Sequence, residues 1–144
     1  MSDILLDVKD LVIHYETDDG LVQALNGVSL QIHTGKTLGL VGETGAGKTT
    51  LAKGIMQLVP NPPGKIKGGE VFYDGEDLLK KSVQEMRKVR GKQISMIFQD
   101  PMTSLNPVFT VSRQVSEPFI IHQGMTKKQA AAKAIEMLAD VKIP

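Results

Sequence analysis

The chain has 144 residues, which suits one domain or a large part of one, and its 41% apolar and 23% charged residues are ordinary for a globular protein. A formal net charge of +1 gives no reason to expect a nucleic-acid binder, and zero cysteines exclude disulfides, thiolate metal sites and a cysteine nucleophile in this stretch. There is no secretory signal and no apolar run near the ~18 residues of a membrane span, so we expect a cytosolic protein that could dock on a membrane partner.

The N-terminal third predicts an antiparallel ribbon. Residues 4–15 are rich in Leu, Val and Ile and predict a strand, and Asp18-Asp19-Gly20 supplies a turn. Residues 21–32 predict a second strand with a bend or bulge at Asn26-Gly27.

The middle of the chain predicts strands buried on both faces. Residues 37–41 form a short, continuously apolar run, and residues 93–98 form another. Between them, helical spacing of apolar residues predicts a helix from about Lys48 to Pro60. A further strand is expected at residues 69–73, before the turn Asp74-Gly75.

Three helices are expected in the remainder, over residues 82–90, over residues 108–122 and from Thr126 onward. Thr126 with Gln129 three positions later matches a capping box. The apolar face of the last helix is predicted to hold Ala130, Ala131, Ala134, Ile135 and Leu138. This order of strands and helices indicates an α/β fold.

The strongest motif is a phosphate loop. The pattern G-x-x-x-x-G-K-[ST] is matched in full by Gly42, Gly47, Lys48 and Thr49, between a predicted strand and a predicted helix. Glycines let backbone N–H groups converge on phosphate oxygens, and the helix N-terminus adds partial positive charge. The sequence therefore predicts ATP with Mg²⁺ as ligands, bound by Gly42, Glu43, Thr44, Gly45, Ala46, Gly47, Lys48, Thr49 and Thr50.

Within the loop, two side chains have distinct expected roles. Lys48 is expected to reach the β- and γ-phosphates and to serve catalysis, and the Thr49 hydroxyl is expected to ligate Mg²⁺. The motif alone leaves kinases, GTPases, helicases and transport ATPases open.

The flanking residues resemble the ATP-binding cassette (ABC) family. The resemblance is carried by residues 28–42, by residues 69–78, and above all by residues 94–107, which are similar to the glutamine-loop region of importer subunits for oligopeptides, dipeptides and nickel. It extends from Leu5 to Pro144. It implies a P-loop NTPase fold, the ABC nucleotide-binding domain with an N-terminal antiparallel β ribbon.

Two further site residues follow from the resemblance. Gln99 matches the family's loop glutamine, which implies contact with Mg²⁺ and the attacking water, a catalytic role and signalling to the membrane subunits. Residue patterns alone would allow Asp100 instead, since an apolar run that ends in Asp imitates a Walker-B strand. Tyr15 stands where the family places an aromatic that stacks on adenine, an interaction worth roughly 1–3 kcal/mol per base.

The resemblance also implies partners and a place in the cell. The loop from Gln99 to Val108 would contact transmembrane permease subunits, a second ATP-binding subunit would complete a dimer, and an external solute-binding protein would act indirectly. The subunit would lie on the cytoplasmic face of the cell membrane, and no nucleic acid is expected. Two prolines and an asparagine predict that the loop from Pro101 to Val108 is a defined, exposed turn.

Subdomain boundaries follow the same pattern. The antiparallel β subdomain is expected over 1–36 and 69–76, the P-loop core over 37–60 and 93–100, and the start of a helical subdomain over 108–144. The sequence contains no signature motif, no later Asp-Glu Walker-B pair and no switch histidine. We therefore expect a truncated ABC domain that binds nucleotide but hydrolyses little.

The residues also allow three functions other than the ATP-binding subunit of an ABC importer that the resemblance implies. One is a soluble ABC ATPase acting on nucleic acid or ribosomes, supported only by a basic run of Lys80, Lys81, Arg87, Lys88, Arg90 and Lys92, for which a solvated helix face is the simpler interpretation. The second is a P-loop phosphotransferase, for which an acceptor site is missing. The third is a nucleotide-binding module without catalysis.

Overall fold

The computed structural model describes residues 3–99 and 104–143, which divide into two units, Met1–Met86 and Arg87–Pro144. Among the described residues, no helix is long and apolar enough to cross a bilayer.

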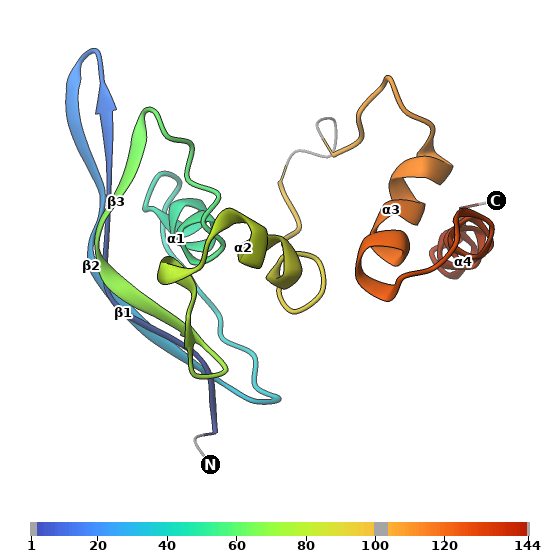
Figure 1. Ribbon diagram of the computed structural model, residues 1–144. Helices are drawn as coiled ribbons and strands as arrows, with labels where there is room; N and C mark the ends of the chain where they lie inside the picture. Colours follow the sequence, from blue (N-terminus) through green and yellow to red (C-terminus); the bar gives the residue numbers. More distant parts are fainter. Residues whose placement is uncertain (1–2, 100–103, 144) are drawn as a thin grey trace. The chain divides into compact units, whose positions relative to one another are not determined.

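The first unit is built on two long antiparallel strands, β1 (Ile4–Thr17) and β2 (Gly20–His33) (Figure 1). They confirm the predicted ribbon, and each extends beyond its predicted bounds. The pairing passes from Val12↔Asn26 to Leu11↔Val28 and so skips Gly27, which has a φ of 84°. The predicted bulge at Asn26-Gly27 is therefore confirmed, and glycine suits it because φ is positive there.

Two further strands complete a sheet of order β2-β1-β3-β4. They are β3 (Gly64–Tyr73) and β4 (Glu76–Asp77), joined by the predicted turn at Asp74 and Gly75, where both φ values are positive, 49° and 80°. Positive φ at both central residues is typical of a type I′ hairpin turn. β3 begins earlier than predicted because residues 64–68 pair with β1, a partnership that their Gly- and Lys-rich sequence does not indicate.

Helix α1 (Lys48–Ile55) packs against this sheet, and close packing explains a glycine within it. A Cβ on Gly54 would lie 2.5 Å from Ile13 Cδ1 and 3.2 Å from Leu11 Cδ2. The 3-10 helix η1 (Leu78–Lys80) and helix α2 (Val83–Val89) follow β4, and α2 confirms the helix predicted over 82–90. The buried apolar residues of the first unit are Leu6, Val8, Leu11, Ile13, Leu25, Leu51, Met56, Val71, Leu78 and Met86.

The end of α1 was predicted at Pro60, and this was wrong. The helix ends at Ile55, and Gln57 adopts a left-handed φ of 51°. The N–H of Leu58 bonds to Lys53 O at 2.7 Å and that of Gln57 to Gly54 O at 3.0 Å, the two bonds of a Schellman motif. Tertiary contact holds this non-glycine cap in place, since the Gln57 side chain donates to the carbonyl of Leu78.

The strands predicted at 37–41 and 93–98 are absent from the structure, and this expectation was also wrong. Val41 is 93% exposed and Ile97 is 98% exposed, and neither segment joins a sheet. A strand buried on both faces needs hydrogen-bonded neighbours and covering helices. Within the described residues the only pairing there is an isolated parallel bridge between Arg90 and Ile94. The proposed subdomain boundaries stay predictions.

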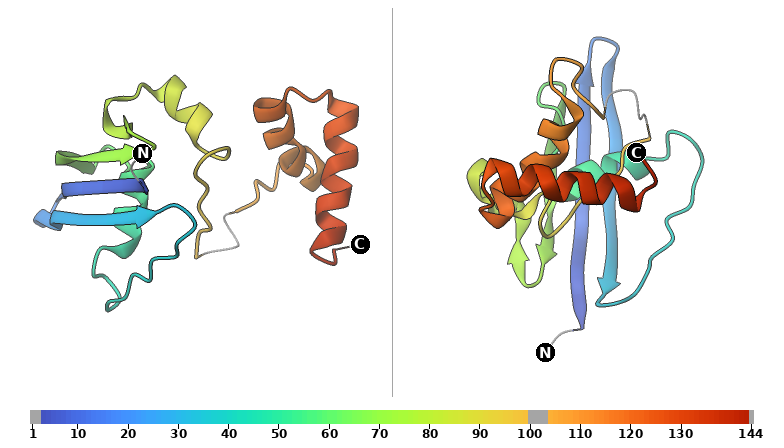
Figure 2. Two further views of the ribbon diagram at one scale, coloured as in Figure 1. Left: turned by 90° about the horizontal axis from the view of Figure 1, so that it is seen from below. Right: turned by 90° about the vertical axis from the view of Figure 1, so that its right-hand side faces the viewer.

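The second unit contains α3 (Val111–Gln123) and α4 (Lys127–Asp140), joined by a short turn (Figure 2). α3 begins later than the predicted residue 108 because the Thr110 hydroxyl accepts the N–H of Arg113 and caps the helix. The capping box of Thr126 and Gln129 is confirmed. Ala130 and Ala134 are buried as predicted, but Ile135 is 67% exposed, so the buried face of α4 is narrower than expected.

Candidate functional site

The loop of residues 42–49 leads directly into α1 and rests on β2. Gly45 and Gly47 have φ values of 86° and 85°, which favour glycine. Gly47 is the N-cap residue of α1, and a Cβ on it would lie 2.8 Å from both Ala24 O and Leu25 Cδ2. Two independent reasons therefore favour glycine at position 47: the positive φ and the close contact with β2.

Lys48 turns back across the loop that precedes it. Its Nζ donates to the carbonyls of Gly42 and Glu43, each at 2.6 Å. A Cβ on Gly42 would lie 3.8 Å from this nitrogen and 3.4 Å from Ala46 Cβ. An ammonium group has three N–H donors, so one donor remains beyond the two carbonyls. The charge of Lys48 thus lies over its own loop.

Several backbone N–H groups around this ammonium lack partners. Ala46 N–H bonds to Glu43 O at 3.2 Å. Among the described residues, no hydrogen bond engages the N–H groups of Thr44, Gly45, Gly47, Lys48 or Thr49. Free N–H groups at a helix N-terminus carry partial positive charge and favour an anion. The first turn of α1 contains no acidic residue that could take this place.

The two threonines of the site are on the first turn of α1. Thr49 is exposed and Thr50 half-buried, and neither hydroxyl has a partner within residues 3–99 and 104–143. Mg²⁺ prefers oxygen ligands and keeps several waters when it binds beside phosphates. An exposed hydroxyl next to the lysine of the loop fits that preference.

Tyr15 lies in the same unit and adjoins the same part of β2 as the loop. It pairs with Val22 on one side and with Gly64 on the other, and a Cβ on Gly64 would lie 2.8 Å from Tyr15 Cε1. Val22 is two residues from Ala24, the β2 residue in contact with Gly47, which is roughly 7 Å along a strand. Tyr15 and Gly47 therefore adjoin β2 at positions two residues apart.

Gln99 belongs to the second unit, whereas Tyr15 and the loop belong to the first. Gln99 is exposed, and it follows the segment predicted as a buried strand. The alternative residue Asp100 and the loop residues 101–103 lie outside the described residues. Ser104 to Val108, the rest of the predicted coupling loop, is exposed.

Sequence reasoning missed Gln114, which orders this loop. Gln114 bonds to Asn106 and Phe109 through its side chain, and Asn106 Oδ1 accepts the N–H of Val108 at 2.9 Å. The expectation of a defined, exposed turn is confirmed for its described part. The position of Gln114 one helical turn after the capping Thr110 is the one available signal, and it is a weak one.

Comparison with known proteins shows to which family the chain is related. Residues 25–144 match the family model described as ABC transporter. The oligopeptide transport ATP-binding protein OppD of Bacillus subtilis is 49% identical over 140 residues, which are 97% of this chain and 39% of that protein. The Bacillus subtilis dipeptide transport ATP-binding protein DppD and the Escherichia coli OppD are each 43% identical, over 97% and 99% of this chain. The chain spans about two fifths of the length of these curated relatives.

Solved structures agree on the fold. The dimeric structure of MJ0796, a bacterial ABC transporter cassette, matches with a TM-score of 0.77 at 26% identity, over 93% of this chain and 56% of that one. A dimeric post-hydrolysis state of MJ0796 bound to ADP and Pi matches with a TM-score of 0.75. The predicted P-loop NTPase fold is thereby confirmed. The chain belongs to the ABC transporter family.

Proposed function

We propose that this chain binds Mg-ATP through residues 42–50, as part of the ATP-binding subunit of a peptide importer. The observation that carries the proposal is the set of unpartnered N–H groups at the start of α1, beside the ammonium of Lys48. A triphosphate would satisfy these donors, and its charge would meet the helix N-terminus and the lysine at one place. Thr49 would ligate Mg²⁺ beside the phosphates.

The adenine would stack on Tyr15. Support comes from the position of this ring along β2, beside the strand segment that holds Gly47. The side chain of Tyr15 is half-buried, so part of it stays accessible to a base.

In the whole subunit, ATP hydrolysis would drive peptide uptake, with nickel as the other solute class. Gln99 would contact Mg²⁺ and the attacking water. A second ATP-binding subunit would complete the dimer, as the dimeric state of the MJ0796 cassettes suggests. The subunit would lie on the cytoplasmic face of the membrane, and an external solute-binding protein would select the solute.

The turn at residues 106–109, where Gln114 bonds to Asn106 and Phe109, supports contact with a membrane subunit. Four large apolar side chains around it are exposed although the turn is held by hydrogen bonds: Leu105, Val108, Phe109 and Val111. Apolar surface held in a fixed shape is typical of a protein interface.

Nucleotide binding is tested by thermal stabilisation. A ligand that binds only the folded state stabilises it by RT ln(1 + [L]/Kd), about 2.7 kcal/mol at a ligand concentration of 100 Kd. We expect Mg-ATP to raise the melting temperature of the chain and of Lys53→Ala, and to have little effect on Lys48→Ala. Lys53 is a matched control because it lies on the same helix, outside the loop. Equal stabilisation of both variants would contradict the assignment.

Hydrolysis by the chain alone is tested separately. Phosphoryl transfer depends on positioning and electrostatic stabilisation, and the groups that complete the site would come from the rest of the subunit and its partner. We therefore expect turnover well below about 1 s⁻¹ from this chain. A rate of that size, lost in Lys48→Ala, would show that the chain is sufficient for catalysis.

A further inference from the structure

A small hollow in the second unit is lined by three cationic side chains, one histidine, one glutamine and one isoleucine. Its volume is about 260 Å³, and we call it the basic hollow; its lining residues are Arg87, Lys88, Lys92, Gln93, Ile121 and His122. They come from the end of α2, from the turn that follows it and from the last turn of α3. No acidic side chain lines it.

The turn after α2 is held firmly. Lys92, Gln93 and Ile94 all donate their N–H groups to Val89 O, at 3.3, 2.8 and 3.1 Å, and Gly91 N–H bonds to Ile94 O at 2.8 Å. Lys92 and Gln93 are therefore presented on an ordered backbone.

The turn also lies against α3. Gly91 has a φ of 80°, and a Cβ on it would lie 3.1 Å from His122 Nε2, so the missing side chain gives room for the imidazole. This close approach positions His122 beside the cations of the turn.

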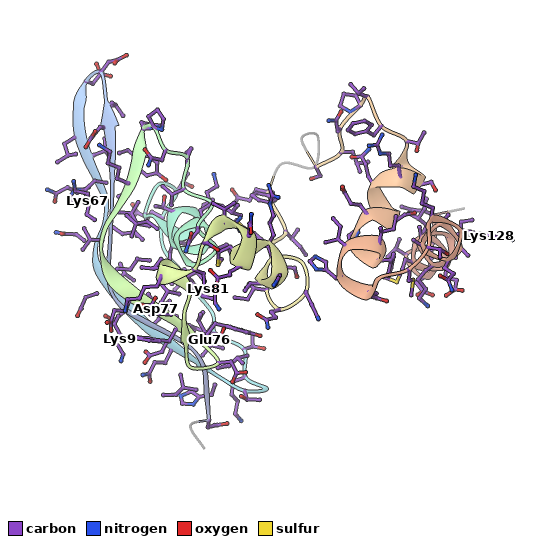
Figure 3. The ribbon with its side chains drawn as sticks, in the orientation of Figure 1. Lys9, Lys67, Glu76, Asp77, Lys81 and Lys128 are labelled. Atoms are coloured by element: carbon purple, nitrogen blue, oxygen red, sulfur yellow. The ribbon has the colours of Figure 1, made fainter. Side chains whose placement is uncertain are left out.

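The three cations of the hollow form no ion pair within the described residues. The same basic run contains two paired lysines. Lys80 binds Asp77 at 2.9 Å. Lys81 binds Glu76 at 2.5 Å, and both residues are labelled in Figure 3. None of the ion pairs in the described part of the chain includes Arg87, Lys88 or Lys92.

The neighbouring guanidinium of Arg90 lies close to the charge of Arg87. The pKa of Arg90 lies below its ordinary value, first because the group is partly buried and then because the positive charge of Arg87 is close.

Helix polarity accounts for only part of this arrangement. Cations are favoured near helix C-termini, which explains Arg87 and Lys88 at the end of α2. Lys92 lies outside the helices, and helix polarity gives no reason for all three cations to line one hollow.

We propose that the basic hollow binds a phosphate group, carried by a small soluble anion or by the headgroup of an anionic phospholipid. Arg and Lys side chains donate charge-assisted hydrogen bonds to phosphate oxygens, and Arg87 can do so in the bidentate manner. No aromatic residue lines the hollow, so a nucleic-acid base would have no surface for stacking. The hollow shares no residue with the loop at 42–49, so it is a second anion site.

The direct test is a titration with inorganic phosphate, followed by amide NMR at constant ionic strength. The chain carries Lys48→Ala throughout, so that the loop at 42–49 contributes little. We expect saturable shifts at residues 91–93 and His122, with affinity at least tenfold weaker in Lys92→Gln and in Arg87→Gln. Lys128→Gln is the matched control, because it removes the same charge from an exposed position on α4 (Figure 3).

The two sources of phosphate are separated by flotation with vesicles. One set contains 30 mol% phosphatidylglycerol in phosphatidylcholine, and the other contains phosphatidylcholine alone. Flotation with the anionic set that Lys92→Gln abolishes and Lys128→Gln preserves would assign a lipid headgroup. Saturable phosphate binding without flotation would assign a soluble anion.

Three outcomes would overturn the proposal. Shifts that stay linear in phosphate, together with no flotation, would show that nothing binds. Equal losses in Lys92→Gln and Lys128→Gln would show general attraction by charge. Tighter binding of single-stranded RNA than of either phosphate source, lost in Lys92→Gln, would assign the surface to nucleic acid.

Discussion

Gln114 holds both backbone groups of Asn106. Its side-chain oxygen accepts the Asn106 N–H at 2.7 Å, and its side-chain nitrogen donates to the Asn106 carbonyl at 2.9 Å. The same nitrogen donates to Phe109 O at 2.9 Å, and the guanidinium of Arg113 lies 3.9 Å from the centre of the Phe109 ring. One amide on the first turns of α3 thus fixes the turn that precedes the helix.

Replacing this amide should release the turn while the helix persists. Gln114→Ala removes the three hydrogen bonds to Asn106 and Phe109 and a longer one, 3.5 Å, to Thr110 O. Each is worth about 0.5–1.5 kcal/mol, and exposure places the sum at the low end, roughly 1–2 kcal/mol. We expect hydrogen exchange at Asn106 to accelerate about tenfold. The control is Gln123→Ala, at the exposed end of the same helix. If the amide of Asn106 exchanges at the same rate in both variants, the hydrogen bonds of Gln114 do not order the turn.

Gly54→Ala should destabilise the first unit although alanine favours helices. The helix gains about 1 kcal/mol from the substitution, but the new Cβ would lie 2.5 Å from Ile13 Cδ1, and overpacking costs about 1–3 kcal/mol. We expect a lower denaturation midpoint in urea. Gly39→Ala is the comparison, since its Cβ would meet nothing within 4 Å. A midpoint for Gly54→Ala at or above that of Gly39→Ala would refute the packing argument.

Gly47→Ala should impair both stability and nucleotide binding. Alanine is strained at a φ of 85°, and its Cβ would press on Ala24 O and Leu25 Cδ2, which moves the loop away from β2. Lys48→Ala, in contrast, should weaken Mg-ATP binding with a smaller loss of stability without ligand, since it removes two hydrogen bonds to exposed loop carbonyls but introduces no clash. The two effects are separated by melting curves with and without Mg-ATP. Unaltered nucleotide affinity in Gly47→Ala would show that the loop tolerates this displacement.

Thr126→Ala should shorten or fray α4. The Thr126 hydroxyl accepts the N–H of Gln129, and the Gln129 side chain accepts the N–H of Thr126. Loss of an N-cap costs about 1 kcal/mol. We expect weaker far-UV helicity and a lower urea midpoint, both largely restored in Thr126→Ser. If Thr126→Ser does not restore helicity and the midpoint, the loss comes from the threonine methyl group and not from the hydroxyl cap.

The Glu16–Lys65 pair should make the β1–β3 pairing sensitive to acid. A hydrogen bond from Lys65 at 2.7 Å, and then its charge, lower the pKa of the Glu16 carboxyl. A lowered folded-state pKa means that the pair stabilises the fold above the ordinary carboxyl pKa and that the contribution fades as pH falls through the lowered value. NMR titration should show the Glu16 pKa return toward its ordinary value in Lys65→Met. An unchanged Glu16 pKa in that variant would contradict this cause.

Local chemistry made much of the fold predictable. The turns at Asp18-Asp19-Gly20 and Asp74-Gly75, the bulge at Gly27 and the capping box of Thr126 depend on residues close in sequence, so their patterns could be recognised directly. The start of helix α1 was predicted correctly, because the phosphate-loop motif itself fixes the first turn of the helix. Its end was misplaced, because Gln57 stops α1 through contact with Leu78, which is distant in sequence.

The sequence by itself determined the phosphate-loop pattern, the order of helices and turns, and the resemblance to ABC proteins, since each rests on residue types at short, fixed spacing. Only the tertiary structure decided that Tyr15 and Gly47 adjoin the same part of β2 and that Gln114 brackets Asn106. It also decided that residues 37–41 are exposed and that residues 93–98 are exposed except for the half-buried Ile94 and Met96. Apolar composition gives a segment the capacity to become a buried strand, but hydrogen-bonded neighbours decide whether it does.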